Sequence, residues 1–322
     1  MNYRGKMALT ELDIKILKYI YLHGLLESDT TIAKCLKISP TTLNYSITKM
    51  EKENIIQGYR YRFDLSTIGL CKVAWVFVAL QYNNLDLEKI IDYFANIPCV
   101  RVVNFVTGLY DISLKIYGKD IYEITKCTLK FEEDLQDKIK SVSTYFIVKN
   151  YKQFNLPIPK VMKEIRLKKA ALDVLNERIE NPELSLVEIA DRLKMHRNTV
   201  GKIMKWLLKK HIILKKSALI NPNYHQQIGI GFKAIIVFEP MVGKSEELAN
   251  KLAELDIIHE LNLIAPANNL LAVLRVSDID DYYHFINTFF KNPKYYKLIS
   301  KTTTRVIVKT KETPVPLFKI IA

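Results

Sequence analysis

Hydrophobic positions in the first fifty residues recur at helical spacing. Leu12, Ile16 and Ile20 share one face of a predicted helix. Residues 30–36 predict a short second helix, and residues 37–39 a tight turn after it. The chain therefore opens with two short helices and a turn that leads into a third.

The third predicted helix has an apolar face and a polar face. Ser39 suits its cap, and Pro40 suits its first position, where no N–H is needed. The apolar positions, at i, i+4 and i+7, are Leu43, Ile47 and Met50. The opposite face presents Thr41, Asn44, Tyr45, Thr48 and Lys52. A helix, a tight turn and a helix with a polar outer face are typical of the helix-turn-helix, whose second helix enters the DNA major groove.

Beyond residue 56 the pattern changes to that of β-strands, and residues 57–63 predict one short strand. Four further strand-like runs follow, at residues 73–81, 100–107, 111–117 and 141–149. Helical patterns at residues 85–96 and 119–135 separate them. The resulting order is βαββαβ, the ferredoxin-like arrangement, in which helices cover one sheet face and leave the other apolar. An uncovered apolar face of this size needs a partner.

The whole pattern occurs twice. At an offset of 157 residues Ile32–Ile38 matches Ile189–Met195, and at an offset of 160 residues Ile147–Lys149 matches Ile307–Lys309. The second copy repeats the short strand at residues 214–220. Its βαββαβ elements are residues 230–239, 245–255, 257–265, 270–276, 278–290 and 299–309. The chain is one unit written twice, so the sister unit is available to cover the apolar sheet face.

The fold class that follows is α+β, with two helix-turn-helix domains, each ending in a short strand, alternating with two ferredoxin-like βαββαβ domains. The expected helix-turn-helix domains are residues 1–68 and 164–222, and the expected βαββαβ domains are residues 69–154 and 223–322. Residues 155–163 are a predicted Pro-containing linker, extended and fairly stiff. We expect the two copies to form an intramolecular pseudo-dimer, and formation of a further homo-oligomer is left open.

Positive charge is concentrated in one segment. The formal net charge of the chain is +14. Residues 160–222 contain 15 basic and 7 acidic residues, a net charge of 15 − 7 = +8, whereas residues 1–68 contain 10 and 7, a net charge of 10 − 7 = +3. Lys215 and Lys216, on the strand after the basic helix, extend the predicted patch. A solvated helix face is the alternative explanation. The helix-turn-helix context together with this charge favours contact with double-stranded DNA.

The candidate DNA-contacting residues come from the third helix of each copy. They are Thr41, Thr42, Asn44, Tyr45, Thr48 and Lys49 in the first copy, and Arg197, Asn198, Thr199, Lys202, Lys205 and Lys209 in the second. Arg197 stands at the start of its helix, where base edges are reached, and the lysines stand where phosphates would lie.

Other functional classes are disfavoured. No apolar run approaches the ~18–20 residues that a membrane span requires, and Met1–Lys6 lacks the apolar core of a signal peptide, so the expected location is the cytoplasm without a membrane partner. The four cysteines lie in apolar patterns without a CxxC pair and are interpreted as small core residues: Cys35, Cys71, Cys99 and Cys127. The six His residues are scattered. We therefore expect no metal site, no cofactor and no catalytic residue.

Taken in order and spacing, these motifs resemble the leucine-responsive regulatory protein (Lrp/AsnC, or feast/famine) family. The segments that carry the likeness include Leu12–Leu17, Ile38–Leu43, Asn54–Tyr59, Gly108–Asp111 and Ala218–Pro222. The resemblance implies DNA binding by winged helix-turn-helix domains, dimer formation through the βαββαβ sheets, and regulation by small ligands, often amino acids. One departure is that the Arg usual on the recognition helix is Ser46 here, and Ile203 in the second copy.

The resemblance also implies an effector pocket at a turn that contains Gly108, Tyr110 and Asp111. An amino-acid ammonium needs an anionic partner, which Asp111 would supply, and Gly108 would allow a close backbone approach. A plain turn-capping role for Asp111 is an equal alternative. The second copy has Ala267 and Leu270 at the matched positions, so at most one such effector per chain is expected.

Two other functions remain as alternatives. A branch of the same superfamily consists of siroheme decarboxylases, some fused in tandem, whose sites include a His after the sheet helix. His259 falls near that position, whereas the first copy has Val102 or Val103 there. The second alternative is a ligand-sensing scaffold whose helix-turn-helix heads no longer bind DNA. The sequence favours a DNA-binding transcriptional regulator without enzyme activity over both.

Overall fold

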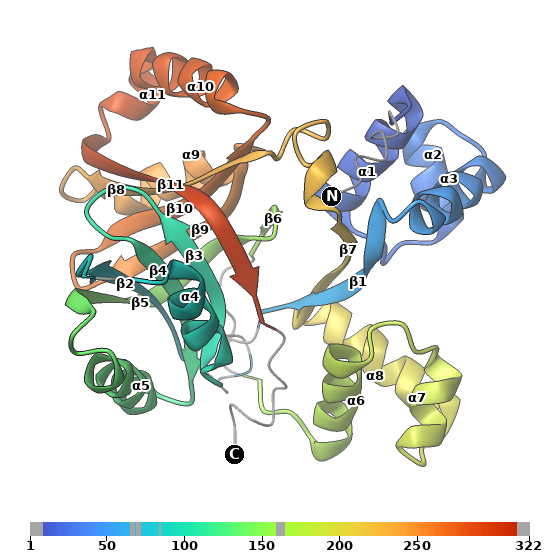
Figure 1. Ribbon diagram of the computed structural model, residues 1–322. Helices are drawn as coiled ribbons and strands as arrows, with labels where there is room; N and C mark the ends of the chain where they lie inside the picture. The colour runs from blue at the N-terminus through green and yellow to red at the C-terminus, as the bar shows by residue number, and fades with distance from the viewer. Residues whose placement is uncertain (1–8, 65–67, 69–71, 84, 159–164, 314–322) are drawn as a thin grey trace.

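The computed structural model describes residues 9–64, 68, 72–83, 85–158 and 165–313. Two helical heads lie on one side of a closed β-sheet, and a two-stranded sheet runs between the heads (Figure 1). No helix in these ranges is long and apolar enough to cross a membrane.

The first head consists of three helices whose starts are set by side-chain caps. They are α1 (Glu11–His23), α2 (Asp29–Leu36) and α3 (Pro40–Lys52). Thr10 and Asp13 form a capping box before α1, and the side chains of Ser28 and Ser39 cap α2 and α3. Ile16, Leu43 and other apolar residues of the predicted faces are buried together beneath the helices. The three helices lie where the hydrophobic pattern predicts them.

The second head repeats this arrangement with α6 (Lys169–Glu180), α7 (Leu186–Arg192) and α8 (Arg197–Lys209). Ser185 and Glu188 form a capping box at α7, and His196 caps α8. Val200 and Leu207 of α8 are fully buried against α6 and α7. The outer face of α8 is thereby turned to solvent.

The strand after each head pairs with its counterpart from the other copy. β1 (Ile56–Phe63) and β7 (Ile213–Ile220) form an antiparallel two-stranded sheet, in which Arg60 lies opposite Ser217 and Arg62 opposite Lys215. Each head contributes a single strand, so the wing that the family resemblance implies is formed jointly by the two copies. A lone strand leaves backbone N–H and C=O groups unpaired, and the matching strand is supplied by the sister copy.

Eight longer strands form the closed sheet. The first copy supplies β2 (Lys72–Leu80), β3 (Val100–Val106), β4 (Ile112–Gly118) and β5 (Ile139–Gln153). The second supplies β8 (Phe232–Pro240), β9 (Ile258–Ala265), β10 (Asn269–Val276) and β11 (Ile299–Glu312). A short 3-10 helix, η2 (Pro222–Tyr224), precedes β8. Within the copies the orders are β5-β2-β4-β3 and β11-β8-β10-β9. The strands and helices thus follow the expected sequence in each half.

The two halves do not form separate sheets, which corrects the expectation of two βαββαβ domains with one sheet each. β3 pairs with β11 and β5 pairs with β9, so the strands of both copies join into one continuous, closed sheet. Each half alone would expose two unpaired edge strands, and mutual pairing removes all four edges.

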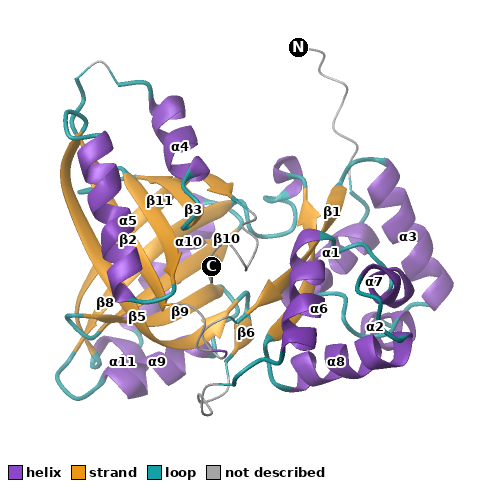
Figure 2. Ribbon diagram, turned by 90° about the horizontal axis from the view of Figure 1, so that it is seen from below, coloured by secondary structure: helices purple, strands orange, loops and turns teal. Residues whose placement is uncertain are grey.

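Helices pack on the outside of the closed sheet (Figure 2). They are α4 (Leu87–Asn96), α5 (Ile121–Asp134), α9 (Ser245–Ala253), α10 (Ile279–Lys291) and α11 (Pro293–Tyr296). The face without helices lies inside the closed sheet, where Trp75 and Phe77 of the first copy pack with Leu271 and Val273 of the second. The sister half therefore supplies the partner that the uncovered face needs.

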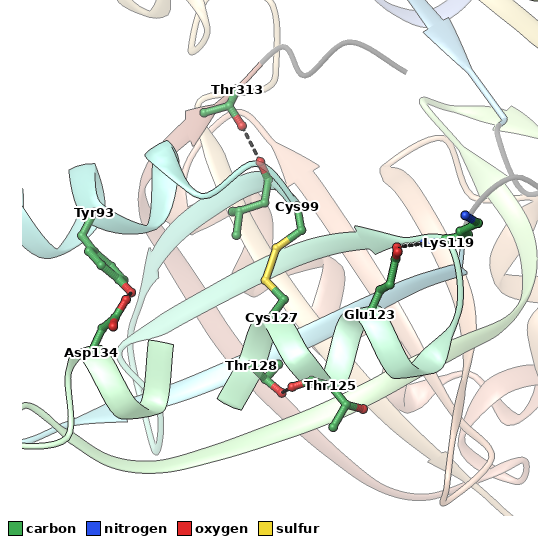
Figure 3. Close-up of a disulfide and its surroundings, with 10 residues drawn as sticks. Tyr93, Cys99, Lys119, Glu123, Thr125, Cys127, Thr128, Asp134 and Thr313 are labelled. Atoms are coloured by element: carbon green, nitrogen blue, oxygen red, sulfur yellow. Dashed lines mark hydrogen bonds between the residues drawn. A yellow bond between two sulfur atoms is a disulfide. The ribbon is translucent and has the colours of Figure 1, made fainter. Parts of the chain in front are cut away.

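The cysteine interpretation needs correction. Cys99 and Cys127 form a disulfide that joins the start of β3 to α5 (Figure 3), and Cys35 is exposed. Cys71 lies outside the described residues. The βαββαβ topology brings the start of β3 and α5 into one layer, a proximity that the sequence separation of 28 residues does not indicate.

The predicted linker is also partly wrong. Phe154 and Asn155 adopt left-handed backbone conformations and reverse the chain, and β6 (Leu156–Pro157) then pairs back onto β5. The first part of the linker is thus a tight turn held by the sheet. Its residues 159–163 lie outside the described residues.

Candidate DNA-binding faces and a cationic pocket

The polar faces of α3 and α8 are both exposed. The exposed residues among the predicted contacts are Thr41, Asn44, Tyr45, Thr48, Arg197, Asn198, Thr199, Lys202, Lys205 and Lys209. Tyr45 is 72% exposed, although a large aromatic ring ordinarily packs against its neighbours. These two polar surfaces are called the reading faces below.

Thr42 and Lys49 are half-buried and contribute to the fold of the first head. The Thr42 hydroxyl lies 2.8 Å from that of its cap residue Ser39. The Lys49 ammonium lies 3.2 Å from the buried carboxylate of Asp13. Burial alone would raise the pKa of Asp13, but hydrogen bonds from Thr10 and the charge of Lys49 lower it. Replacement of Lys49 would therefore disturb the head as well as any DNA contact.

Lys215 does not extend the basic patch, which corrects that expectation. Its side chain is buried, and its ammonium donates hydrogen bonds to the carbonyl oxygens of Tyr21 (2.7 Å) and Leu22 (3.1 Å) at the end of α1. Burial, together with the positive charges of Arg62 and Arg275, lowers the pKa of Lys215 to about 7. Lys216 is partly exposed, and its ammonium lies 3.6 Å from the carboxylate of Glu183.

This depressed pKa predicts that stability increases with pH. Between pH 7 and 8 the unfolded chain binds a proton at residue 215 that the folded chain partly releases, so the free energy of unfolding should rise by about 1 kcal/mol. Burial lowers the pKa of Lys233 to about 8, and this residue contributes mainly above that window. Urea unfolding at several pH values measures the rise. Lys215→Met should remove it and Lys216→Met should retain it; a rise that persists in Lys215→Met would contradict the assignment.

The predicted effector residues lie together at the turn between β3 and β4. The Asp111 carboxylate accepts hydrogen bonds from the Leu80 N–H (2.7 Å) and from the Tyr82 hydroxyl. The Tyr110 hydroxyl lies 2.7 Å from that of Ser143, and Gly108 has a positive φ of 106°. Both carboxylate oxygens of Asp111 are thus already engaged within the fold.

A pocket that the sequence did not indicate lies between the two-stranded sheet and the closed sheet. It consists of two connected parts with cavity volumes of about 160 and 390 Å³, and the larger lies in the range of small-molecule sites. Its charged lining consists of seven cationic side chains, Arg60, Arg62, Arg101, Lys115, Lys215, Lys233 and Arg275, and the carboxylates Glu260 and Glu312. This lining defines the cationic pocket.

His259 enters the pocket because β9 carries an irregularity. The register between β9 and β10 shifts between Glu260 and Ile258, and such a bulge re-aims side chains, so that the neighbouring His259 and Glu260 both line the pocket. Burial and the surrounding positive charges, Arg275 foremost, hold the pKa of His259 well below its usual value. His259 is therefore neutral.

The contacts of His259 indicate which ring nitrogen carries the proton. Its Nδ1 lies 2.6 Å from Oδ1 of Asn155, whose amide nitrogen donates to the carbonyl oxygen of Asp256. Since that amide oxygen can only accept, we assign the proton to Nδ1 and the lone pair to Nε2. The Tyr21 hydroxyl, 3.0 Å from the same Nδ1, links this imidazole to the first head.

Glu312 is the carboxylate at the centre of the pocket's guanidinium groups. Its Oε2 lies 2.6 Å from a guanidinium nitrogen of Arg60 and 3.1 Å from one of Arg62. The charges of Arg62, Arg60 and Arg275 lower the pKa of Glu312 to about 2. At neutral pH it is a fixed negative charge that neutralises part of the lining.

Sequence reasoning missed this pocket because its residues are spread from position 21 to position 313. The available signal was the i, i+2 spacing of Arg60 and Arg62, which places both on one face of a strand. Nothing in the sequence indicated that this face would meet the closed sheet. Among the described residues no cluster of His, Cys, Asp or Glu has the geometry of a metal site.

Comparison with models of protein families finds no match. The chain is 32% identical over 120 residues to an HTH-type transcriptional regulator of Pyrococcus furiosus, covering 36% of this chain and 79% of that protein. It is 28% identical over 119 residues to the regulatory protein AsnC of Haemophilus influenzae, covering 37% of this chain and 78% of that protein.

Among solved structures, the siroheme decarboxylase NirDL has a similar fold, with a TM-score of 0.63 and 15% identity over 97% of this chain and 96% of that one. That enzyme has also been solved with an iron-uroporphyrin III analogue. Each of these two regulators thus matches less than half of this chain, whereas the enzyme shares the fold of nearly all of it.

Proposed function

The chain belongs to the Lrp/AsnC family of helix-turn-helix transcriptional regulators, and on this premise we propose that it binds double-stranded DNA through both of its heads. The observation that carries the proposal is the pair of exposed reading faces on α3 and α8. Each is held outward by a buried apolar face, and the antiparallel pairing of β1 with β7 ties the two together. The basic residues of α8 supply attraction to phosphates, and the polar residues of α3 supply hydrogen bonds to bases.

The DNA site preferred by this protein should not be a palindrome. Two identical reading heads select two identical half-sites, but here Thr41, Asn44 and Tyr45 of one face correspond to Asn198, Gly201 and Lys202 of the other. We expect selection from a random DNA pool to yield two different half-sites in fixed order. Recovery of a symmetric inverted repeat would count against this prediction, and the absence of any selected sequence against the proposed function itself.

The pseudo-dimer belongs to the same proposal. The two halves share one closed sheet, so the arrangement that single-unit family members would reach by dimer formation is built into one chain. Whether chains associate further is measurable by sedimentation, and the proposal does not require it.

An amino-acid effector at Gly108, Tyr110 and Asp111 stays a prediction. An ammonium group at Asp111 would have to displace the Tyr82 hydroxyl. Arg305 of β11, whose guanidinium lies 5.3 Å from the Tyr110 ring centroid, has nitrogens Nε and Nη1 without a hydrogen-bond partner among the described residues. It would supply the countercharge for a carboxylate at this turn.

A siroheme-decarboxylase-like enzyme is the second candidate function. The observation that favours it is the position of His259 in the lining of the cationic pocket, in a chain whose full-length fold resembles such an enzyme. The guanidinium and ammonium groups would bind the carboxylates of the substrate, and Nε2 of His259 would exchange a proton with it. A copurifying tetrapyrrole, seen as a Soret band, and release of CO2 from siroheme would favour this function over the regulator.

A further inference from the structure

The cationic pocket holds like charges directly opposite one another. Arg62 of β1 lies opposite Lys215 of β7, and Arg275 of β10 lies opposite Lys233 of β8. Like charges at facing positions destabilise a sheet. Both pairs line the same part of the pocket, one on the two-stranded sheet and one on the closed sheet. The fold thus brings two repulsive pairs together from two different sheets.

The protein's own carboxylates neutralise only part of this charge. The Glu260 carboxylate lies 2.5 Å from the Lys115 ammonium, and the Glu312 carboxylate forms ion pairs with Arg60 and Arg62. No carboxylate among the described residues lies within ion-pair distance of Arg275 or Lys233, although the charge of Glu312 reaches both, and Nε of Arg275 is buried without a hydrogen-bond partner there. Arg275 and Lys233 are half-buried, and cations that outnumber the carboxylates around them repel one another, so such clusters mark functional sites.

The contact between Glu312 and the two arginines indicates the chemistry that the pocket accepts. A carboxylate already lies within hydrogen-bond distance of two guanidinium groups, so their arrangement suits a carboxylate. Arg275 and Lys233, on the opposite wall, would accept a second one. A ligand with two or more carboxylates would therefore bridge the two sheets.

We propose that the cationic pocket binds a small polycarboxylate, that Glu312 competes with it from within the chain, and that its binding strengthens the interaction with DNA. The last clause rests on the proposed function. β1 and β7 start within four residues of the ends of α3 and α8, so the strands that line the pocket also carry the reading helices. A bridging ligand removes the repulsion across the pocket and fixes both strands against the closed sheet. Heads already fixed lose less conformational freedom when DNA binds.

Calorimetric titration with citrate, in the absence of DNA, tests the site itself. We expect saturable binding of one citrate per chain, with inorganic phosphate binding at least about tenfold more weakly because it cannot span both walls. Glu312→Gln should tighten citrate binding by about tenfold and Arg275→Gln should weaken it by about tenfold. Glu254→Gln, in an exposed ion pair with Lys294, is the matched control and should leave it unchanged. Thermal unfolding of each variant verifies that it folds.

Absence of citrate binding, equal binding of phosphate, or identical behaviour of Glu312→Gln and Glu254→Gln would overturn the proposed site. The coupling between citrate binding in the pocket and DNA binding by the heads is then measured as DNA affinity at constant ionic strength, with and without saturating citrate. We expect affinity to rise at least threefold in the wild type and to stay constant in Arg275→Gln. Unchanged or weakened DNA binding would overturn the link. Loss of DNA binding under all conditions would instead reject the proposed function, while leaving the calorimetric result intact.

Discussion

Replacing Lys202 and Lys205 together with Ala is expected to weaken duplex DNA binding by about 60-fold at 0.1 M salt. Both side chains project from the exposed face of α8, where each would neutralise one phosphate and release about 0.9 counterions. Loss of two contacts should flatten the plot of log affinity against log salt by about 1.8, and over the decade from 1 M to 0.1 M that amounts to about 60-fold. Fluorescence anisotropy at several salt concentrations measures both quantities.

A matched control separates local contact from net charge. Lys291, the last residue of α10, and Lys297, which directly follows α11, are both exposed, and their replacement with Ala also removes two positive charges. We expect little change in the salt slope for this pair. Equal losses for the two double variants would mean that DNA is attracted by the overall charge and that the reading face of α8 has no special part in binding.

Glu260→Gln is expected to lower the free energy of unfolding by about 3–5 kcal/mol, the effect of leaving a buried charge unpaired. Glu260 and Lys115 are both at least nine-tenths buried, and their ion pair joins β9 of the second copy to β4 of the first. Burial alone would lower the pKa of Lys115, but the Glu260 carboxylate raises it, so the ammonium stays charged while its partner is present. Urea unfolding at pH 7 measures the loss.

The double variant Lys115→Met with Glu260→Leu tests the cause. If the loss in Glu260→Gln comes from an uncompensated ammonium, removing both charges should restore most of the stability. Glu254→Gln breaks an exposed ion pair and should change stability by no more than about 1 kcal/mol. A double variant as unstable as Glu260→Gln would show that packing, and not charge, accounts for the effect.

Local structure was largely predictable from the sequence because local forces determine it. The spacing of Leu43 and Met50, with Ser39 before them, is enough to place α3 and to identify its outward face. The alternation and length of the apolar runs similarly located the strands of both halves. Such patterns report which side of an element is buried, and that information lies within a few residues.

Long-range pairing could not be obtained in this way. Lys215 follows a basic helix and reads as part of its patch, yet pairing of β7 with β1 places it beneath α1. The resemblance placed His259 near a decarboxylase-site position, but its entry into the cationic pocket depends on the bulge in β9 and the turn at Asn155. Each outcome depends on contacts between residues roughly a hundred or more positions apart, which a single sequence without covariation does not reveal.

The pairing of strands between the two halves has a consequence for how this protein assembles in the cell. A sheet built from separate subunits can accept any chain whose edge strands match. Here the edges of β3 and β5 are already paired with β11 and β9 of the same chain. In the described part of this sheet the one edge strand is β6, and at two residues it is too short to serve as a template for a foreign subunit. Fusion of the two units insulates this regulator from cross-assembly and keeps its two unlike reading faces in a constant one-to-one ratio.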